Sequence, residues 1–196
     1  MSKANLLERR SVVAALLEGR KDAIAVGGLG ASTYDIAAAG DHDRNFYLWG
    51  AMGGAVMIGL GVALAQPELP VVVITGDGEM LMGMGSLATV GLQQPKNLTI
   101  VVLDNEVYGE TGGQASHTGT NTDLVGVAKA CGIRDARNVA TMAEIKAFAA
   151  SMQDVKAGPR FASIKIDSAN LERVLASRDG TFIVNRIRGS LGFGPI

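Results

Sequence analysis

The 196-residue sequence has few of the side chains on which many small proteins depend. Its single cysteine, Cys131, excludes an internal disulfide and fits a reducing compartment. The sequence contains only two histidines in addition to that cysteine, so it offers no convincing set of zinc ligands. Eighteen basic and nineteen acidic residues leave a net charge of −1, so neither nucleic acid nor an anionic membrane surface is indicated as a partner. The charged N-terminus MSKANLLERR does not resemble an export signal, and we expect a cytoplasmic protein.

One uncharged run, residues 48–65, approaches the length of a membrane span. It contains five glycines, has Arg44 as the only basic residue near either end, and stops at Gln66-Pro67. We therefore expect no membrane segment but a helix, from about Gly50 to Gln66, that is buried by protein on all sides. Its small residues would let another backbone or a cofactor approach closely.

Helical and strand patterns alternate along most of the chain, which predicts a single doubly wound parallel sheet with helices on both faces. The segments with strand character are uninterrupted apolar runs typical of buried parallel strands. We expect strands at 22–26, 70–75, 97–103 and 160–166, and helices at 5–19, 32–39, 50–66, 80–93, 122–130 and 141–152. Ser32 or Thr33 would cap the second helix.

The final segment does not follow this alternation. Residues 1–170 are expected to form the sheet domain, and residues 171–196 a C-terminal tail. The apolar side chains of the tail have no obvious strand partner. It would pack on a neighbouring subunit or add a last edge strand to the sheet.

Ligands of doubly wound sheets bind at the carboxyl ends of the strands, and three of the expected strands end in unusual residues. The first runs into the glycine turn 27–33, which either binds phosphate at the following helix start or is an ordinary turn. Because Thr33 stands where a third glycine would be needed, the turn does not match the dinucleotide-binding fingerprint.

The second strand ends in Gly76-Asp77-Gly78-Glu79, and the third in Asp104-Asn105-Glu106-Val107. If these strands are neighbours, Asp77 and Asn105 face each other across one crevice. A carboxylate, an amide oxygen and a nearby backbone carbonyl form a hard oxygen site, which suits Mg²⁺ or Ca²⁺.

The Gly-Asp-Gly sequence, with 27 residues between Asp77 and a later Asn105, resembles the thiamine diphosphate-binding motif. The family usually ends this motif with two asparagines, and the first is replaced here by Asp104. The resemblance implies thiamine diphosphate as cofactor, with Asp77, Asn105 and the Val107 carbonyl as metal ligands. It also implies that Gly76, Gly78, Glu79 and Ser32 surround the diphosphate.

The segment NFYLWGAMG, residues 45–53, is similar to the family's loop around the aminopyrimidine. By this resemblance Met52 wedges the cofactor into its bent shape, and the Gly50 carbonyl accepts from the amino group. Without this resemblance, Met52 would be interpreted as a core methionine. Together with GDGEMLMGMGSLATVG, PKNLTIVVLDNE and GGQASHTG, the segment resembles sulfopyruvate and phosphonopyruvate decarboxylases.

Enzymes of this kind need a second domain whose glutamate protonates the pyrimidine ring. The chain has no room for that domain, so the resemblance implies a β-type subunit of a hetero-oligomer whose α subunit brings the glutamate. The substrate would be a small anionic 2-oxo acid. His117 and Gln114 are candidates for contacting it, although His117 is equally well explained as a solvated loop residue.

Two other functions remain open at this point. The same cofactor site would serve a carboligase or a 2-oxo acid oxidoreductase component, because it does not determine the fate of the intermediate after the first decarboxylation. A non-catalytic regulator that binds a nucleotide or phosphate would have the same α/β fold.

Overall fold

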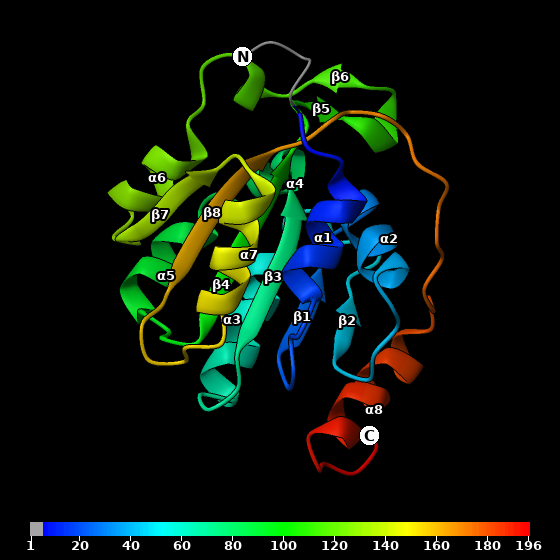
Figure 1. The fold of residues 1–196 in the computed structure, drawn as a ribbon. Coiled ribbons are helices and arrows are strands. Elements are labelled where there is room, and N and C mark those ends of the chain that lie inside the picture. The colour runs from blue at the N-terminus through cyan, green and yellow to red at the C-terminus, as the bar shows by residue number, and fades with distance from the viewer. Residues whose placement is uncertain (1–5) are drawn as a thin grey trace.

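The computed structural model describes residues 6–196, so the expected helix start at Asn5 lies outside it. Six parallel strands form one sheet in the order β2-β1-β3-β4-β8-β7, as Figure 1 shows. Their bounds are β1 Ile24–Gly27, β2 Asn45–Tyr47, β3 Val71–Gly76, β4 Leu98–Asp104, β7 Asp135–Val139 and β8 Arg160–Lys165. The expected doubly wound parallel sheet is confirmed.

Helices cover both faces of the sheet (Figure 1). One face carries α1 Arg9–Leu17, α2 Ala31–Ala38 and α7 Met142–Ser151. The other carries α3 Ala55–Ala65, α4 Asp77–Met82, α5 Ser86–Gln93 and α6 Leu124–Ala130. A last helix, α8 Gly180–Ser190, packs beside the edge strand β2.

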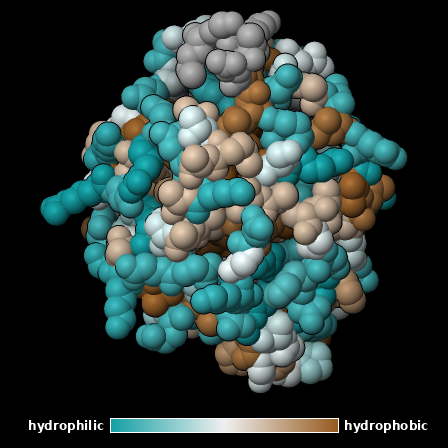
Figure 2. Space-filling model, viewed as in Figure 1, coloured by the Kyte–Doolittle hydropathy of each residue, from teal (hydrophilic) through white to brown (hydrophobic). Residues whose placement is uncertain are grey.

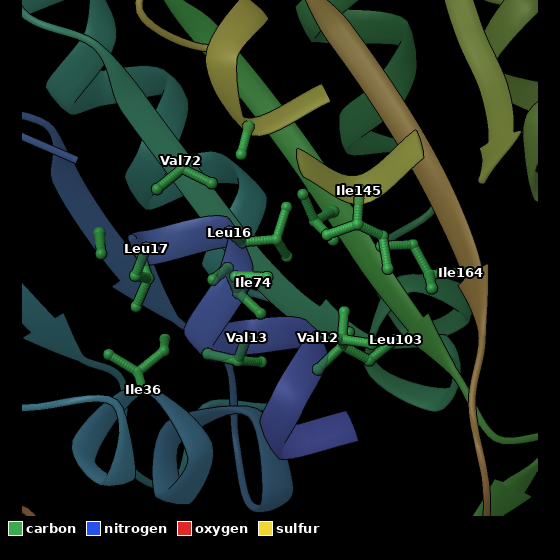
Figure 3. Close-up of a cluster of buried hydrophobic side chains, with 14 of the residues drawn as sticks. Val12, Val13, Leu16, Leu17, Ile36, Val72, Ile74, Leu103, Ile145 and Ile164 are labelled. Carbon is green, nitrogen blue, oxygen red and sulfur yellow. The ribbon is translucent and has the colours of Figure 1, made fainter. Parts of the chain in front are cut away.

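The sheet is buried on both faces because its strands are apolar at nearly every position. Successive side chains of a strand point to opposite faces. In β3, Val72 and Ile74 therefore join the cluster under α1 and α7, while Val71 and Val73 join the cluster under α3 and α5. Figure 3 shows the first cluster, where Leu16 of α1 lies over β3 and its neighbours.

The strand order places a topological switch point between β1 and β3. From β1 the chain moves outward to β2, then returns to β3 on the other side and continues to β4. The loops that leave β1 and β3 therefore diverge, which opens a crevice at their carboxyl ends. The hairpin of β5 Val107–Tyr108 and β6 Gln114–Ala115 lies above this edge, and the chain enters α1 at the same edge (Figure 1).

The C-terminal tail follows the edge of the molecule from β8 to α8 (Figure 1). Ile183 and Ile187 of α8 are buried, and Arg186 reaches Asp41 with 2.6 Å between Nη1 and Oδ2. Trp49 Nε1 donates to the Ser177 carbonyl at 2.8 Å. The expectation of a final edge strand is wrong, because the apolar residues of 182–187 have helical spacing and cover the short strand β2. Packing on a second subunit stays a prediction.

The glycine-rich helix differs from its prediction in length and in burial. It begins at Ala55, because positive φ angles at Gly50 and Gly53 keep the preceding residues in a loop. It is not buried on all sides in this chain, since Met57 and Leu64 are 45% and 50% exposed. Its inner face comes close to β3 at Gly59, where a Cβ atom would lie 2.1 Å from Val73 Cγ2.

Three further features of the fold differ from the sequence-based expectations: the start of α2, the continuity of one helix, and the presence of two additional strands. Gly30, not Ser32 or Thr33, precedes the first residue of α2, and both hydroxyls instead donate to the Gly28 carbonyl. The helix expected at 80–93 is two helices separated at Gly83 and Gly85. Strands β2 and β7 were not predicted, because one has three residues and the other carries polar side chains.

No helix among residues 6–196 is long and apolar enough to cross a membrane. On the face shown in Figure 2, hydrophilic residues cover most of the surface, and the most hydrophobic residues appear as separate small groups.

The two glycines of α3 provide a test of this packing. Gly59→Ala should lower the free energy of unfolding by about 1–3 kcal/mol, because a methyl group there overlaps Val73. Gly61→Ala, two residues away with nothing within 4 Å of its Cβ position, should raise it by about 0.5–1 kcal/mol through helix propensity. Urea unfolding of both variants measures the difference, and equal effects would contradict the contact between α3 and β3.

Candidate active site at the carboxyl edge of the sheet

A cavity of about 310 Å³ opens at the carboxyl ends of β3 and β4. Six segments form its wall: the turn after β1, the loop that contains Met52, helix α4 with the residue before it, the segment after β4, the start of α1 and the segment after β8. Eight of the predicted site residues line it: Ser32, Met52, Gly76, Asp77, Gly78, Glu79, Asn105 and Val107. The second and third strands are neighbours, with Gly76 paired to Leu103, which is the condition for Asp77 and Asn105 to face one crevice.

Asp77 lies at the start of α4, immediately after β3, and is 2% exposed. Its Oδ2 accepts a hydrogen bond from Ser116 Oγ and lies 3.1 Å from Thr118 Oγ1. Burial raises the pKa of Asp77 despite the hydrogen bond from Ser116, and the nearby Asp104 carboxylate raises it further. A cation bound here would remove this electrostatic cost.

Asp104, where the family motif has asparagine, is compensated by Lys165 of β8. Lys165 Nζ lies 2.8 Å from Asp104 Oδ2 and 2.6 Å from Glu106 Oε1. Partial burial opposes protonation of Lys165, but the bonds to Asp104 and Glu106 outweigh it and raise its pKa. Thr118 Oγ1 also lies 2.7 Å from Asp104 Oδ1, so its single proton is shared between two buried carboxylates.

Asn105 and Val107 stand together at the end of β4. The Val107 N–H donates to Asn105 Oδ1 at 3.1 Å, a tight local turn that holds the amide beside the cavity. Among residues 6–196, no three His, Cys, Asp or Glu side chains cluster as a metal site. The predicted ligand set contains only one such residue, Asp77, so its assignment stays a prediction.

Gly78 allows an aromatic ring to pack on the first turn of α4. A Cβ atom at this position would lie 2.6 Å from Cδ1 of Tyr108. Tyr108 and Met52 therefore approach the glycine from the cavity, with Met52 Cε 3.5 Å from the same point. The small residue keeps the backbone of this turn accessible between the two larger side chains.

The Glu79 side chain connects three segments of the site and is 4% exposed. Its Oε2 accepts from the Leu29 N–H at 2.9 Å and from Thr75 Oγ1 at 2.8 Å. Its Oε1 lies 3.3 Å from the Gly53 N–H. One carboxylate thus ties the turn after β1 and the loop around Met52 to the end of β3.

Ser32 and Gly50 differ in their access to the cavity. Ser32 is 3% exposed, and its Oγ donates to the Gly28 carbonyl at 3.2 Å while the residue lines the cavity. Gly50 is exposed, has a φ of +74°, and is not part of the cavity wall. Its carbonyl therefore contributes only to a ligand that extends beyond this wall.

Gln114 and His117 are both exposed and stand outside the cavity. Gln114 Nε2 donates to the Thr111 carbonyl at 2.8 Å, within its own turn. The His117 carbonyl accepts from Thr120, Asn121 and Thr122, which fixes the loop backbone. Their assignment to substrate stays a prediction that depends on what faces this loop.

The cavity also contains residues that the sequence analysis did not select. Arg9 of α1 and residues 168–170 after β8 both line it. The last segment could have been found by applying the strand-end rule to the strand at 160–166. Arg9 begins the helix that runs antiparallel to the first strand, so it reaches the same edge of the sheet.

Residues 26–166, more than half of the chain, match the family "Thiamine pyrophosphate enzyme, C-terminal TPP binding domain". The chain belongs to this family. Its membership agrees with the cavity, which gathers Asp77, Gly78 and Asn105 of the motif.

Within this family, the chain is similar to sulfopyruvate and phosphonopyruvate decarboxylases. The sulfopyruvate decarboxylase subunit beta of Methanocaldococcus jannaschii is 48% identical over 59% of this chain and 60% of its own length. The phosphonopyruvate decarboxylase of Streptomyces viridochromogenes is 50% identical over 61% of this chain and 30% of its own. The chain therefore spans less than two thirds of either protein. The subunit beta of Methanothermobacter thermautotrophicus is 35% identical over 92% of this chain and 94% of its own length.

A solved structure supports the fold. Benzoylformate decarboxylase from Polynucleobacter necessarius superimposes with a TM-score of 0.67 at 21% identity, over 82% of this chain and 33% of that one. At this identity the likeness concerns the arrangement of strands and helices alone.

The Asp104–Lys165 pair leads to a prediction about stability. Lys165→Met leaves a buried carboxylate without its cation and should lower the free energy of unfolding by about 1–2 kcal/mol, less than for a fully buried pair because Lys165 is partly exposed. Adding Asp104→Asn should recover most of the loss, since an amide needs no counter-charge. Urea unfolding at constant m-value measures both variants. A double variant no more stable than Lys165→Met would contradict the pairing.

Proposed function

We propose that this chain is the β-type subunit of a thiamine diphosphate-dependent decarboxylase that acts on a small anionic 2-oxo acid such as sulfopyruvate. The observation that carries the proposal is the common cavity of Asp77, Asn105, Val107 and the first turn of α4. Membership of the thiamine pyrophosphate family and the 35% identity with a sulfopyruvate decarboxylase subunit along nearly the whole chain support it.

The residues of the cavity fit the cofactor. Asp77, Asn105 and the Val107 carbonyl offer oxygen donors suited to Mg²⁺ or Ca²⁺, and the buried Asp77 needs a cation to offset its burial. Gly78 and Glu79 have backbone N–H groups in the first turn of α4, where an anion is favoured. Thiamine diphosphate, when bound, supplies a nucleophilic thiazolium carbon and an electron sink for the departing CO₂.

The chain's own residues would position this cofactor. Met52 projects toward Gly78 from the loop that Glu79 holds, so it would support the bend between the two rings. The Gly50 carbonyl would accept from the amino group further out. Ser32 would contribute at the diphosphate through its N–H group, because its hydroxyl already donates to Gly28.

The glutamate that protonates the pyrimidine would come from a separate pyrimidine-domain subunit. Two glutamates of this chain line the described cavity, and both have other partners. Glu79 binds Leu29, Thr75 and Gly53, and Glu110 forms an ion pair with Arg173 at 3.2 Å. The names of the "subunit beta" relatives are consistent with a second chain. Exposed Gln114 and His117 would then face the partner and the substrate.

Metal binding tests the cofactor site. Asp77→Asn should weaken Mg²⁺-dependent thiamine diphosphate binding by more than about 100-fold, because even residues behind metal ligands contribute about 10- to 100-fold. The matched variant Asp104→Asn removes the same charge from the same buried cluster and should leave the affinity nearly unchanged. Titration calorimetry with Mg²⁺ and the co-expressed partner measures both. Normal affinity in Asp77→Asn, with unchanged thermal unfolding, would refute this crevice as the metal site.

Activity tests the division of the site between two subunits. The chain alone should not release CO₂ from sulfopyruvate, whereas the chain with its pyrimidine-domain partner should produce CO₂ and an aldehyde. Phosphonopyruvate and pyruvate, assayed in parallel, identify the preferred acid. Turnover by the isolated chain would exclude the shared site. Products of carbon–carbon ligation, or a requirement for an electron acceptor, would favour the other thiamine-dependent functions.

A further inference from the structure

We propose that Arg9 is a cationic ligand of the cofactor's diphosphate group, an inference that rests on the proposed function. Arg9 is the first residue of α1, far in sequence from the thiamine motif. It nevertheless lines the same cavity as Gly78, Glu79 and Asn105.

The position of the Arg9 guanidinium is fixed by a buried partner. Its Nε lies 3.2 Å from Asp35 Oδ2, and the Asp35 side chain is fully buried. The Arg9 side chain itself is only 9% exposed. Arg9 thus combines a buried ion pair at Nε with a place in the wall of the cavity. The guanidinium of an arginine is a planar fork that can bind phosphate oxygens in a bidentate manner.

The charges of the cavity favour a cation in this position. Three carboxylates line it, those of Asp77, Glu79 and Glu110, while Arg9 is the sole lysine or arginine in the wall that residues 6–196 form. A diphosphate adds further negative charge. One divalent ion at Asp77 would compensate only part of it, and Arg9 supplies a second positive charge in a position buried from solvent.

Arg10 provides a control for the charge balance at Asp35. Its Nε lies 3.3 Å from Asp35 Oδ1, so it pairs with the same carboxylate, but it does not line the cavity. Arg9→Gln and Arg10→Gln each remove one positive charge from Asp35. Only Arg9→Gln removes a cation from the cavity.

The experiment is titration calorimetry on the full chain with its co-expressed partner, in Mg²⁺, using thiamine diphosphate, inorganic diphosphate and unphosphorylated thiamine. Arg9→Gln should weaken binding of both diphosphates by about 10- to 100-fold, the contribution of a charged hydrogen bond, and leave thiamine unaffected. Arg10→Gln should bind all three as the wild type does. Arg9→Lys, which keeps the charge and loses the fork, should fall between.

The outcomes separate this inference from the proposed function. If the wild type and Arg9→Gln bind thiamine diphosphate with equal affinity, the proposed role of Arg9 is overturned and the proposed function is kept. If the wild type binds inorganic diphosphate in a manner that depends on Arg9 but does not bind thiamine diphosphate, the anion-binding role of Arg9 is kept and the proposed function is overturned. If Arg9→Gln has normal affinity for the cofactor but a raised KM for sulfopyruvate, Arg9 binds the anionic group of the substrate, and the diphosphate assignment is overturned. If the wild type binds neither diphosphate, both fail.

Discussion

The site depends on one buried carboxylate, that of Glu79. A parallel sheet that reverses its winding between β1 and β3 opens a crevice there, but topology alone does not hold the diverging loops at a fixed spacing. Glu79 does so by accepting hydrogen bonds from Leu29, Thr75 and Gly53, which belong to three separate loops or strand ends. Gly28 permits the approach, since a Cβ atom there would lie 1.9 Å from Glu79 Oε2. Glu79 therefore shapes the crevice with its side chain, while its N–H would, under the proposed function, serve the diphosphate.

A second group of buried charges lies on the β4 side of the crevice. Asp77 and Asp104 are both nearly inaccessible, share the hydroxyl of Thr118, and have one cation in Lys165. Such an arrangement is unfavourable without further positive charge. The metal that we propose would provide it on the Asp77 side, and Arg9 would balance the anion that accompanies the metal. The charges of cofactor and protein would thus complement each other across the cavity.

Much of this architecture could be predicted from the sequence, because buried parallel strands produce apolar runs such as 71–75 and 98–103 that have no other good explanation. Asp77 and Asn105 were selected because polar residues directly after such runs lie at the carboxyl ends of the strands, where ligands bind. Short or polar edge strands, β2 and β7, have no such pattern. Arg9 was not selected because its place in the cavity wall depends on its pairing with Asp35 and on the antiparallel course of α1, which are tertiary facts. Ser32 was misread because a hydroxyl near a helix start can cap it or, as here, bind the preceding turn.

The tail from β8 to α8 links two distant parts of the molecule. Residues 168–170 form part of the cavity wall, Glu172 accepts from Arg10, Arg173 pairs with Glu110, and α8 covers β2 at the other end of the same segment. A ligand that binds this wall only while the tail is docked would stabilise the docked tail by mass action. The free energy needed to undock the tail, which ends in a helix on an edge strand, would then rise with the concentration of the proposed cofactor. The protein's resistance to proteolysis at its C-terminus would then report how much of its cofactor site is filled.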